Sequence, residues 1–183
     1  MDSSDTRTHP VIIDLPRSLE RQIARVIIAW ACLEWHITQA AHVLVGIGPQ
    51  TGRIAVREPR MVDRIALVKE LIEHLNVKVD FDFKSFTRDA SDMAERRDWL
   101  AHGIWVNHKP TGKILLRVTK GKWGVQMQDG TAGASRRVYP QGAEVTVSDL
   151  KVLRGVIEDL IRRSDGLTTQ VNEAVAALPP KRP

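Results

Sequence analysis

Residues 83–102, FKSFTRDASDMAERRDWLAH, decide how this chain folds. Apolar residues recur in this stretch at steps of three and four, which is the period of an amphipathic helix. They are Phe86, Ala90, Met93 and Leu100. Arg97 continues the same apolar stripe, and burial of its guanidinium is costly unless an anion accompanies it. The stretch therefore predicts a helix from Phe83 to His102 whose core face includes a cation.

The end of this predicted helix gathers three polar side chains. Asp98 and His102 are four residues apart, so both lie on one flank of the helix, next to the stripe that holds Arg97. Gly103 follows directly, and a glycine commonly ends a helix. A permanent cation, a carboxylate and an imidazole are thus expected in the last two turns.

This arrangement resembles the signature of the HEPN superfamily (higher eukaryotes and prokaryotes nucleotide-binding), in which an arginine precedes a histidine by a short spacer. Here four residues separate Arg97 from His102, and a polar residue, Asp98, follows the arginine. HEPN domains are compact helical bundles with the motif near the end of a late helix, and many are metal-independent ribonucleases. The resemblance implies that Arg97, Asp98 and His102 are catalytic. It also implies a homodimer in which two motifs face one cleft.

The motif residues suit RNA cleavage because RNA carries its own nucleophile, the ribose 2′-hydroxyl. Such an enzyme needs mainly a proton acceptor, a proton donor and positive charge on the phosphate. An imidazole such as that of His102 exchanges protons near neutral pH, and Arg97 can hold a phosphate in a bidentate fork. Asp98 is expected to orient one of these two groups or to polarise a bound group. A single histidine does not easily serve as both base and acid, which again favours a dimer.

A structural role for the same residues is the alternative. Arg97 can pair with a buried carboxylate such as Glu34, which lies in the apolar segment Cys32-Leu33-Glu34-Trp35, while His102 merely caps the helix. Glu34 is then either the ion-pair partner of Arg97 or a further site residue, and we favour the partner role.

Residues near the motif are candidates for contact with RNA. Trp99 and Trp105 flank it and can form an aromatic wall or a dimer contact, whereas Trp30 lies on an apolar stripe and is expected in the core. Basic candidates are Arg96, Arg136 and Arg137. The last two lie in the glycine-rich stretch 129–142, which we expect to be a mobile basic loop.

The remaining sequence predicts a mainly α protein, an antiparallel four-helix HEPN-like bundle with a small antiparallel β meander inserted before the last long helix. One helix is expected from about Asp14 to Gly46 and a second from about Val62 to Leu75. Strand-like alternation follows over 104–139, and the capping-box spacing of Thr146 and Asp149 opens the last helix.

We expect a single domain over 1–183. Residues 11–103 would form its three-helix portion, 104–145 the β insertion with the basic loop, and 146–178 the C-terminal helix. The ends, 1–10 and 179–183, are predicted to be disordered.

The composition fits an ordinary globular domain of 183 residues, with 43% hydrophobic and 27% charged residues. A net charge of +5 favours acidic partners. The single cysteine, Cys32, precludes an internal disulfide and is expected to be a buried thiol, which suits a reducing cytoplasm. No apolar run reaches membrane-spanning length, so we expect a cytoplasmic protein without a membrane partner.

No cofactor or metal is expected. His36 and His42 are six residues apart, which is not the helical spacing of a zinc pair, and no phosphate-loop signature follows the glycines near residue 48.

The leading hypothesis is therefore a metal-independent HEPN-like endoribonuclease, of the kind found as a toxin or a phage-defence effector. Its expected partners are RNA, a second copy of the chain and, for a toxin, a protein antitoxin. The alternatives are a non-catalytic HEPN-like module that binds nucleic acid or protein, and a structural helical oligomer.

Overall fold

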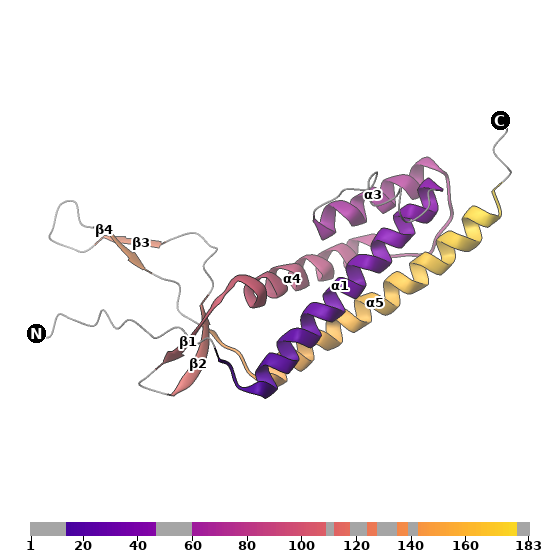
Figure 1. Ribbon diagram of the computed structural model, residues 1–183. Coiled ribbons are helices and arrows are strands. Elements are labelled where there is room, and N and C mark those ends of the chain that lie inside the picture. Colours follow the sequence, from indigo (N-terminus) through magenta and orange to yellow (C-terminus); the bar gives the residue numbers. More distant parts are fainter. Residues whose placement is uncertain are drawn as a thin grey trace, which may run out of the picture.

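The computed structural model describes residues 14–46, 60–108, 112–117, 124–127, 135–138 and 143–178. These include four α-helices that pack into an elongated bundle, with a small antiparallel sheet at one end (Figure 1). The helices are α1 (Arg17–Val45), α3 (Met61–His74), α4 (Phe83–His102) and α5 (Val147–Ala176). The expected mainly helical fold, with a β insertion before the last long helix, is confirmed.

Contacts between the helices show in which direction each helix runs relative to its neighbours. Arg154 Nη1 lies 3.5 Å from Gln22 Oε1 near the start of α5 and α1, and His36 Nδ1 lies 3.7 Å from Asp165 Oδ1 further along both. The two helices are therefore parallel neighbours, as Figure 1 also shows. In contrast α4 runs against α5 and therefore also against α1, so the predicted antiparallel packing holds for α4 with both helices, while α1 and α5 are parallel. The reason is that the insertion starts and finishes at one end, which is also where α1 begins (Figure 1).

The apolar stripes predicted from the sequence form one core. Phe86 and Ala90 of α4 are fully buried, together with Leu33 of α1, Val68 of α3 and Ile157 of α5. Each helix thus buries the apolar stripe that its sequence predicts. No helix in the described part of the chain is both long and apolar enough to cross a membrane.

Local hydrogen bonds define the ends of the helices. The predicted capping box at the start of α5 is confirmed, since the Asp149 N–H donates to Thr146 Oγ1 (3.2 Å) and the Thr146 N–H donates to Asp149 Oδ2 (2.9 Å). The Thr146 hydroxyl also donates to this carboxylate, and the two bonds from Thr146 lower the pKa of Asp149. At the C-terminal end of α1, Gly46 adopts the left-handed conformation (φ 70°) that favours glycine.

The β insertion forms two separate antiparallel sheets. One has the order β1-β2-β5, built from Ile104–His108, Lys113–Arg117 and Ala143–Glu144, and the other pairs β3 (Gly124–Met127) with β4 (Ser135–Val138). The strands predicted around Val106, Leu116 and Val125 are thus present, although Val118 and Trp123 lie outside the described residues.

The expectation of a basic loop over 129–142 is corrected in part. Arg136 and Arg137 lie in β4, where they pair with Gln126 and Val125 of β3. Local composition favoured a loop, but pairing with a second strand satisfies the backbone groups of this segment. Apart from β4, the predicted loop falls outside the described residues.

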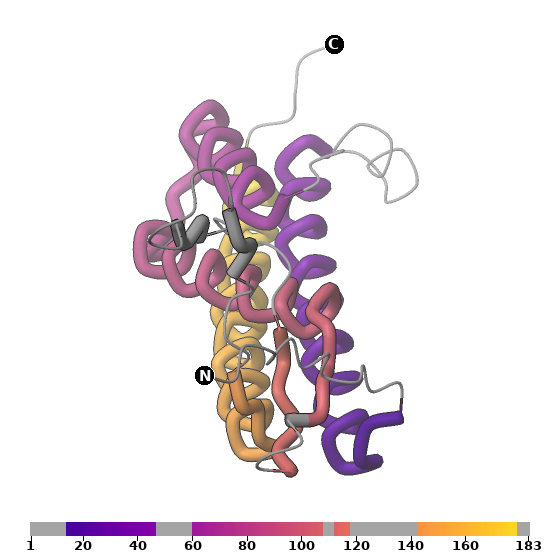
Figure 2. The backbone as a smooth tube through the Cα atoms, turned by 90° about the vertical axis from the view of Figure 1, so that its left-hand side faces the viewer, coloured from indigo at the N-terminus to yellow at the C-terminus, as the bar shows by residue number. Residues whose placement is uncertain are grey.

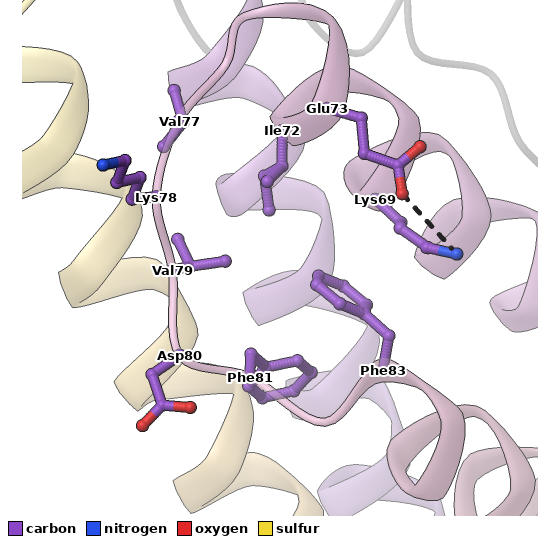
Figure 3. A pocket seen from close by; sticks show the side chains of 9 residues that line it. All are labelled: Lys69, Ile72, Glu73, Val77, Lys78, Val79, Asp80, Phe81 and Phe83. Carbon is purple, nitrogen blue, oxygen red and sulfur yellow. Dashed lines mark ion pairs between the residues drawn. The ribbon is translucent and has the colours of Figure 1, made fainter.

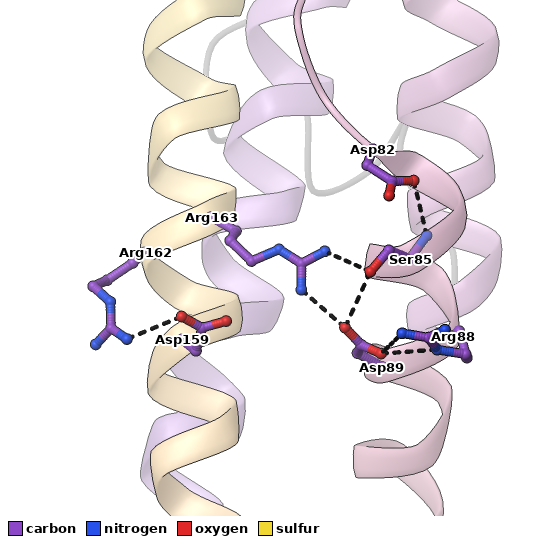
Figure 4. Close-up of polar contacts among 7 residues, drawn as sticks. All are labelled: Asp82, Ser85, Arg88, Asp89, Asp159, Arg162 and Arg163. Carbon is purple, nitrogen blue, oxygen red and sulfur yellow. Dashed lines mark hydrogen bonds and ion pairs between the residues drawn. The ribbon is translucent and has the colours of Figure 1, made fainter.

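A polar cluster joins α4 to α5 (Figure 4). Arg163 Nη1 of α5 donates to Asp89 Oδ2 (2.9 Å), and Arg88 binds the other oxygen of the same carboxylate. The Arg163 guanidinium also lies 5.2 Å from the centre of the Phe86 ring. Hydrogen bonds from Arg163 and then Arg88 hold the pKa of Asp89 below its ordinary value.

Replacing this carboxylate should weaken the bundle in a pH-dependent way. Because the folded-state pKa of Asp89 is lowered, its contribution is complete above the unfolded pKa of about 3.9 and is lost as the pH falls through the folded value. At pH 7 we expect Asp89→Asn to cost about 1 kcal/mol, or about 2–4 °C in Tm. Thermal melts from pH 7 to pH 2.5 should show this difference shrinking in acid.

The matched control for this prediction is Asp159→Asn. Asp159 pairs within α5 with Arg162, and both side chains are more than half exposed, so its loss should barely change the Tm (Figure 4). Equal effects of the two substitutions would show that the Asp89 cluster does not hold α4 to α5.

Candidate functional site

Arg97 lies between α4 and α1 and is surrounded by two carboxylates and an aromatic ring. Its Nη2 is 3.6 Å from Glu34 Oε1 of α1, and its Nη1 is 2.9 Å from Asp98 Oδ1. The guanidinium carbon lies 5.2 Å from the centre of the Trp30 ring, within range of a cation–π interaction. The prediction that Glu34 is the partner of Arg97 is confirmed.

Glu34 is itself fixed by its neighbours on α1. Trp30, which is buried as expected, donates its indole N–H to Glu34 Oε1 (2.9 Å), the same oxygen that faces Arg97. The apolar stripe of the sequence predicts that Trp30 lies in the core, but this contact with Glu34 was not predicted. The signal that could have revealed it is the four-residue spacing between Trp30 and Glu34, which puts both on one face of a helix.

His102 is the last residue of α4 and is exposed. Asp98 lies one turn earlier with 45% of its side chain exposed, and its carboxylate is paired with Arg97. Of the roles considered for Asp98, the structure shows the contact that orients the arginine.

The guanidinium retains capacity to bind an anion. Arginine has five N–H donors, and the two ion pairs engage only part of this set. Among the described residues, Arg97 Nε is buried without a hydrogen-bond partner, while a quarter of the side chain remains exposed. A phosphate that approaches from solvent would compete most directly with Asp98, since Asp98 is more exposed than Glu34.

The other predicted contact residues differ in accessibility. Trp99 is 39% exposed and Arg96 is also exposed, so both remain available to a ligand. Trp105 is only 8% exposed and packs in the core, where its strand partner is Leu116, so the expected aromatic wall cannot include its ring. The side chains of Arg136 and Arg137 lie outside the described part of the structure.

Cys32 corrects another expectation, because its thiol is exposed and not buried. It follows Ala31 on the outer side of α1, whereas the next residue, Leu33, is fully buried. An apolar segment of a long helix includes residues on both faces, so membership in the segment did not fix the direction of the thiol.

The described residues contain no group of three His, Cys, Asp or Glu placed to hold a metal ion. They do form an open pocket of about 540 Å³, lined by α3, the following linker and the start of α4 (Figure 3). Its wall is mostly apolar, including Ile72, Phe81 and Phe83, with Lys69 and Glu73 paired at the rim. It lies at the opposite end of α4 from the motif and is not part of the same site.

Gly103 positions the junction between the motif helix and the sheet. Its backbone N–H donates to the Trp99 carbonyl oxygen (2.8 Å), and its φ of −75° is open to any residue. The constraint is space, since a Cβ here would lie 2.5 Å from both Leu116 Cδ1 and the Trp99 oxygen. A glycine thus allows β1 to leave α4 directly after His102.

Comparison with models of protein families, with curated proteins and with solved structures finds no match for this chain. The interpretation of the site rests on the motif and on the contacts of its residues.

A side chain at position 103 should displace the motif. Gly103→Ala is expected to lower stability by about 1–3 kcal/mol, because the backbone oxygen of Trp99 cannot move aside without opening the last turn of α4. Urea unfolding measures the loss, and NMR should show changed imidazole signals of His102.

Gly166→Ala is the control, since an added Cβ there meets nothing within 4 Å inside α5. It should raise stability by about 0.5–1 kcal/mol through helix propensity. A neutral Gly103→Ala would mean that the helix-to-strand junction adapts freely.

Proposed function

We propose that this chain is a HEPN-like, metal-independent endoribonuclease. The observation that carries the proposal is the arrangement at the end of α4. There an arginine is oriented by Glu34, Asp98 and Trp30, and an exposed imidazole follows five residues later at His102. Charge stabilisation and proton transfer, the two requirements of RNA cleavage, thus fall to residues in the last two turns of one helix.

In the proposed reaction Arg97 binds a non-bridging oxygen pair of the scissile phosphate. The ribose 2′-oxygen attacks phosphorus as an imidazole takes its proton, and the bond from phosphorus to the 5′-oxygen breaks as a second group protonates that oxygen. The products are a 2′,3′-cyclic phosphate and a 5′-hydroxyl. His102 supplies one of the two proton-transfer groups, and His102 of a second copy supplies the other.

The neighbours of Arg97 have a distinct part in this proposal. Glu34 and Trp30 hold the guanidinium from the core side, so its approach to phosphate needs little reordering. Asp98 pairs with it until substrate arrives and then gives way to phosphate. Trp99 and Arg96 are both exposed on the last turns of α4, and in this proposal they would contact a base and the RNA backbone.

The proposed biological setting is what the HEPN resemblance implies. A small basic ribonuclease of this kind is suited to a role as a toxin or phage-defence effector in the cytoplasm, where its partners would be RNA and a neutralising protein antitoxin.

A second candidate function is a non-catalytic HEPN-like module. It is favoured by the ion pairs of Arg97 with Glu34 and Asp98, which also satisfy a purely structural requirement. Such a module would bind RNA in a salt-sensitive manner without turnover, or would serve only as a helical oligomer.

Removal of the imidazole tests the catalytic proposal. We expect the purified protein to cleave single-stranded RNA in excess EDTA and His102→Ala to reduce the rate about 10²- to 10⁴-fold, because a positioned acid–base group contributes about that much. The measurement is single-turnover cleavage of end-labelled RNA, with mass spectrometry of the cyclic phosphate ends.

The control variant is His74→Ala, since His74 is likewise an exposed histidine at the last position of a helix, α3. It should cleave at the wild-type rate. Equal activity of the His102 variant would exclude the assigned role, and RNA binding without cleavage by the wild type would favour the non-catalytic module.

A further inference from the structure

The outer face of α1 carries an exposed apolar stripe. Ile28 is 67% exposed and Trp35 is 58% exposed, although both are large hydrophobic side chains. Small residues lie between and beside them on the same face, namely Ala24, Ala31 and Cys32, all exposed. The helix α1 itself runs along one outer side of the helical body (Figure 2). A contiguous apolar surface of this kind is typical of an interaction site.

Two charged residues limit what can cover this stripe. Arg21 and Arg25, both exposed, extend the stripe towards the start of α1, so one end is basic and the other ends in an exposed indole. A partner must therefore bring an electron-rich group to the arginines and an apolar or cationic group to Trp35. A second copy of α1 that runs in the opposite direction offers both.

We propose that this stripe is a homodimer interface in which α1 packs antiparallel on α1 of a second copy. The inference rests on the proposed function, because one chain supplies a single His102 to a reaction that uses two proton-transfer groups. The second copy completes the site.

The stripe is complementary to itself under a two-fold axis at the level of residue 30. Such an axis places Arg25 against Trp35 of the second copy, where a guanidinium and an indole attract each other. It also places Ile28 against Cys32 of the second copy, a large side chain against a small one. A parallel pair would instead set Arg25 against Arg25, and like charges repel. The charge pattern thus selects the antiparallel arrangement.

The same axis brings the two motifs together. Glu34, which holds Arg97, lies four residues from the level of the axis, and a helix rises about 1.5 Å per residue, so the two arginine sites are about 12 Å apart along the helices. An axis perpendicular to the plane of the two helices keeps equivalent flanks on one side. Both motifs then open onto the same surface, within reach of one RNA strand.

A second exposed apolar pair, Val152 and Val156 on α5, provides the comparison. It is shorter and lies among exposed charged residues, Lys151 and Asp159. It also lies on a helix that contributes no described contact to Arg97, so a dimer through α5 would not bring the motifs together.

The test compares two substitutions at equal exposure. Ile28 and Val152 are both 67% exposed, so a glutamate at either position should leave the monomer folded, which circular dichroism checks. By sedimentation velocity the wild type and Val152→Glu should be dimers. Ile28→Glu and Trp35→Glu should weaken the dimer at least about 30-fold, the effect of losing a central interface residue.

Cross-linking adds a direct readout of geometry. Each chain has one cysteine, Cys32, so a short bismaleimide can join thiols only between copies. It should link the wild type and Val152→Glu efficiently and Ile28→Glu poorly. A monomeric wild type, or dissociation by Val152→Glu in place of Ile28→Glu, would overturn the inference.

Activity separates this inference from the proposed function. Loss of both the dimer and RNA cleavage in Ile28→Glu supports the composite site, whereas full cleavage by monomeric Ile28→Glu overturns it. If Ile28→Glu dissociates the dimer but the wild type never cleaves RNA, the interface on α1 stands and the ribonuclease proposal fails.

Discussion

The structure around the motif depends on one constraint, that a guanidinium in the apolar stripe of α4 must have an anion beside it. Arg97 lies on α4 between the buried residues Met93 and Leu100, and its charge cannot be left unpaired there. Glu34 provides the anion from α1, and the Trp30 indole fixes that carboxylate while offering its ring to the cation. The α1–α4 contact at this level is therefore polar, beside the apolar core of the bundle. It also sets where the last turn of α4 lies.

This arrangement holds the arginine without removing it from solvent. A quarter of the Arg97 side chain is exposed, and its outer neighbour, Asp98, is nearly half exposed. One carboxylate thus belongs to the core and the other to the surface. The proposed ribonuclease uses that difference, since the inner contact orients the guanidinium while phosphate displaces the outer one. The exposed stripe on α1 has a related role in the proposal, because the helix that anchors Arg97 would also bring a second motif to the site.

Much of the fold followed from periodicity and end signals in the sequence. The bounds of α4, the capping box of Thr146 with Asp149, and the pairing of Arg97 with Glu34 were all predicted, because each depends on residues within one helix or on a charge that requires a partner. The relative directions of the helices, and the residues on their outer faces, were harder to predict. The apolar period of α1 does not say that α5 runs parallel to it, and it did not show that Cys32 faces outward. Trp105 and the strand with Arg136 and Arg137 were misjudged because strand pairing, a long-range contact, decides both.

The most direct test of this account is a double-mutant cycle on the free energy of unfolding, with Glu34→Gln, Arg97→Met and the combined variant measured in urea. If Glu34 is the anion that Arg97 requires, each single change leaves its partner unsatisfied, and the double variant should be less destabilised than the two singles added together. The coupling should be about 1 kcal/mol or more, as for charged groups in contact. Additivity to within about 0.3 kcal/mol would contradict the account. In that case the ion pair would not hold the motif helix to α1.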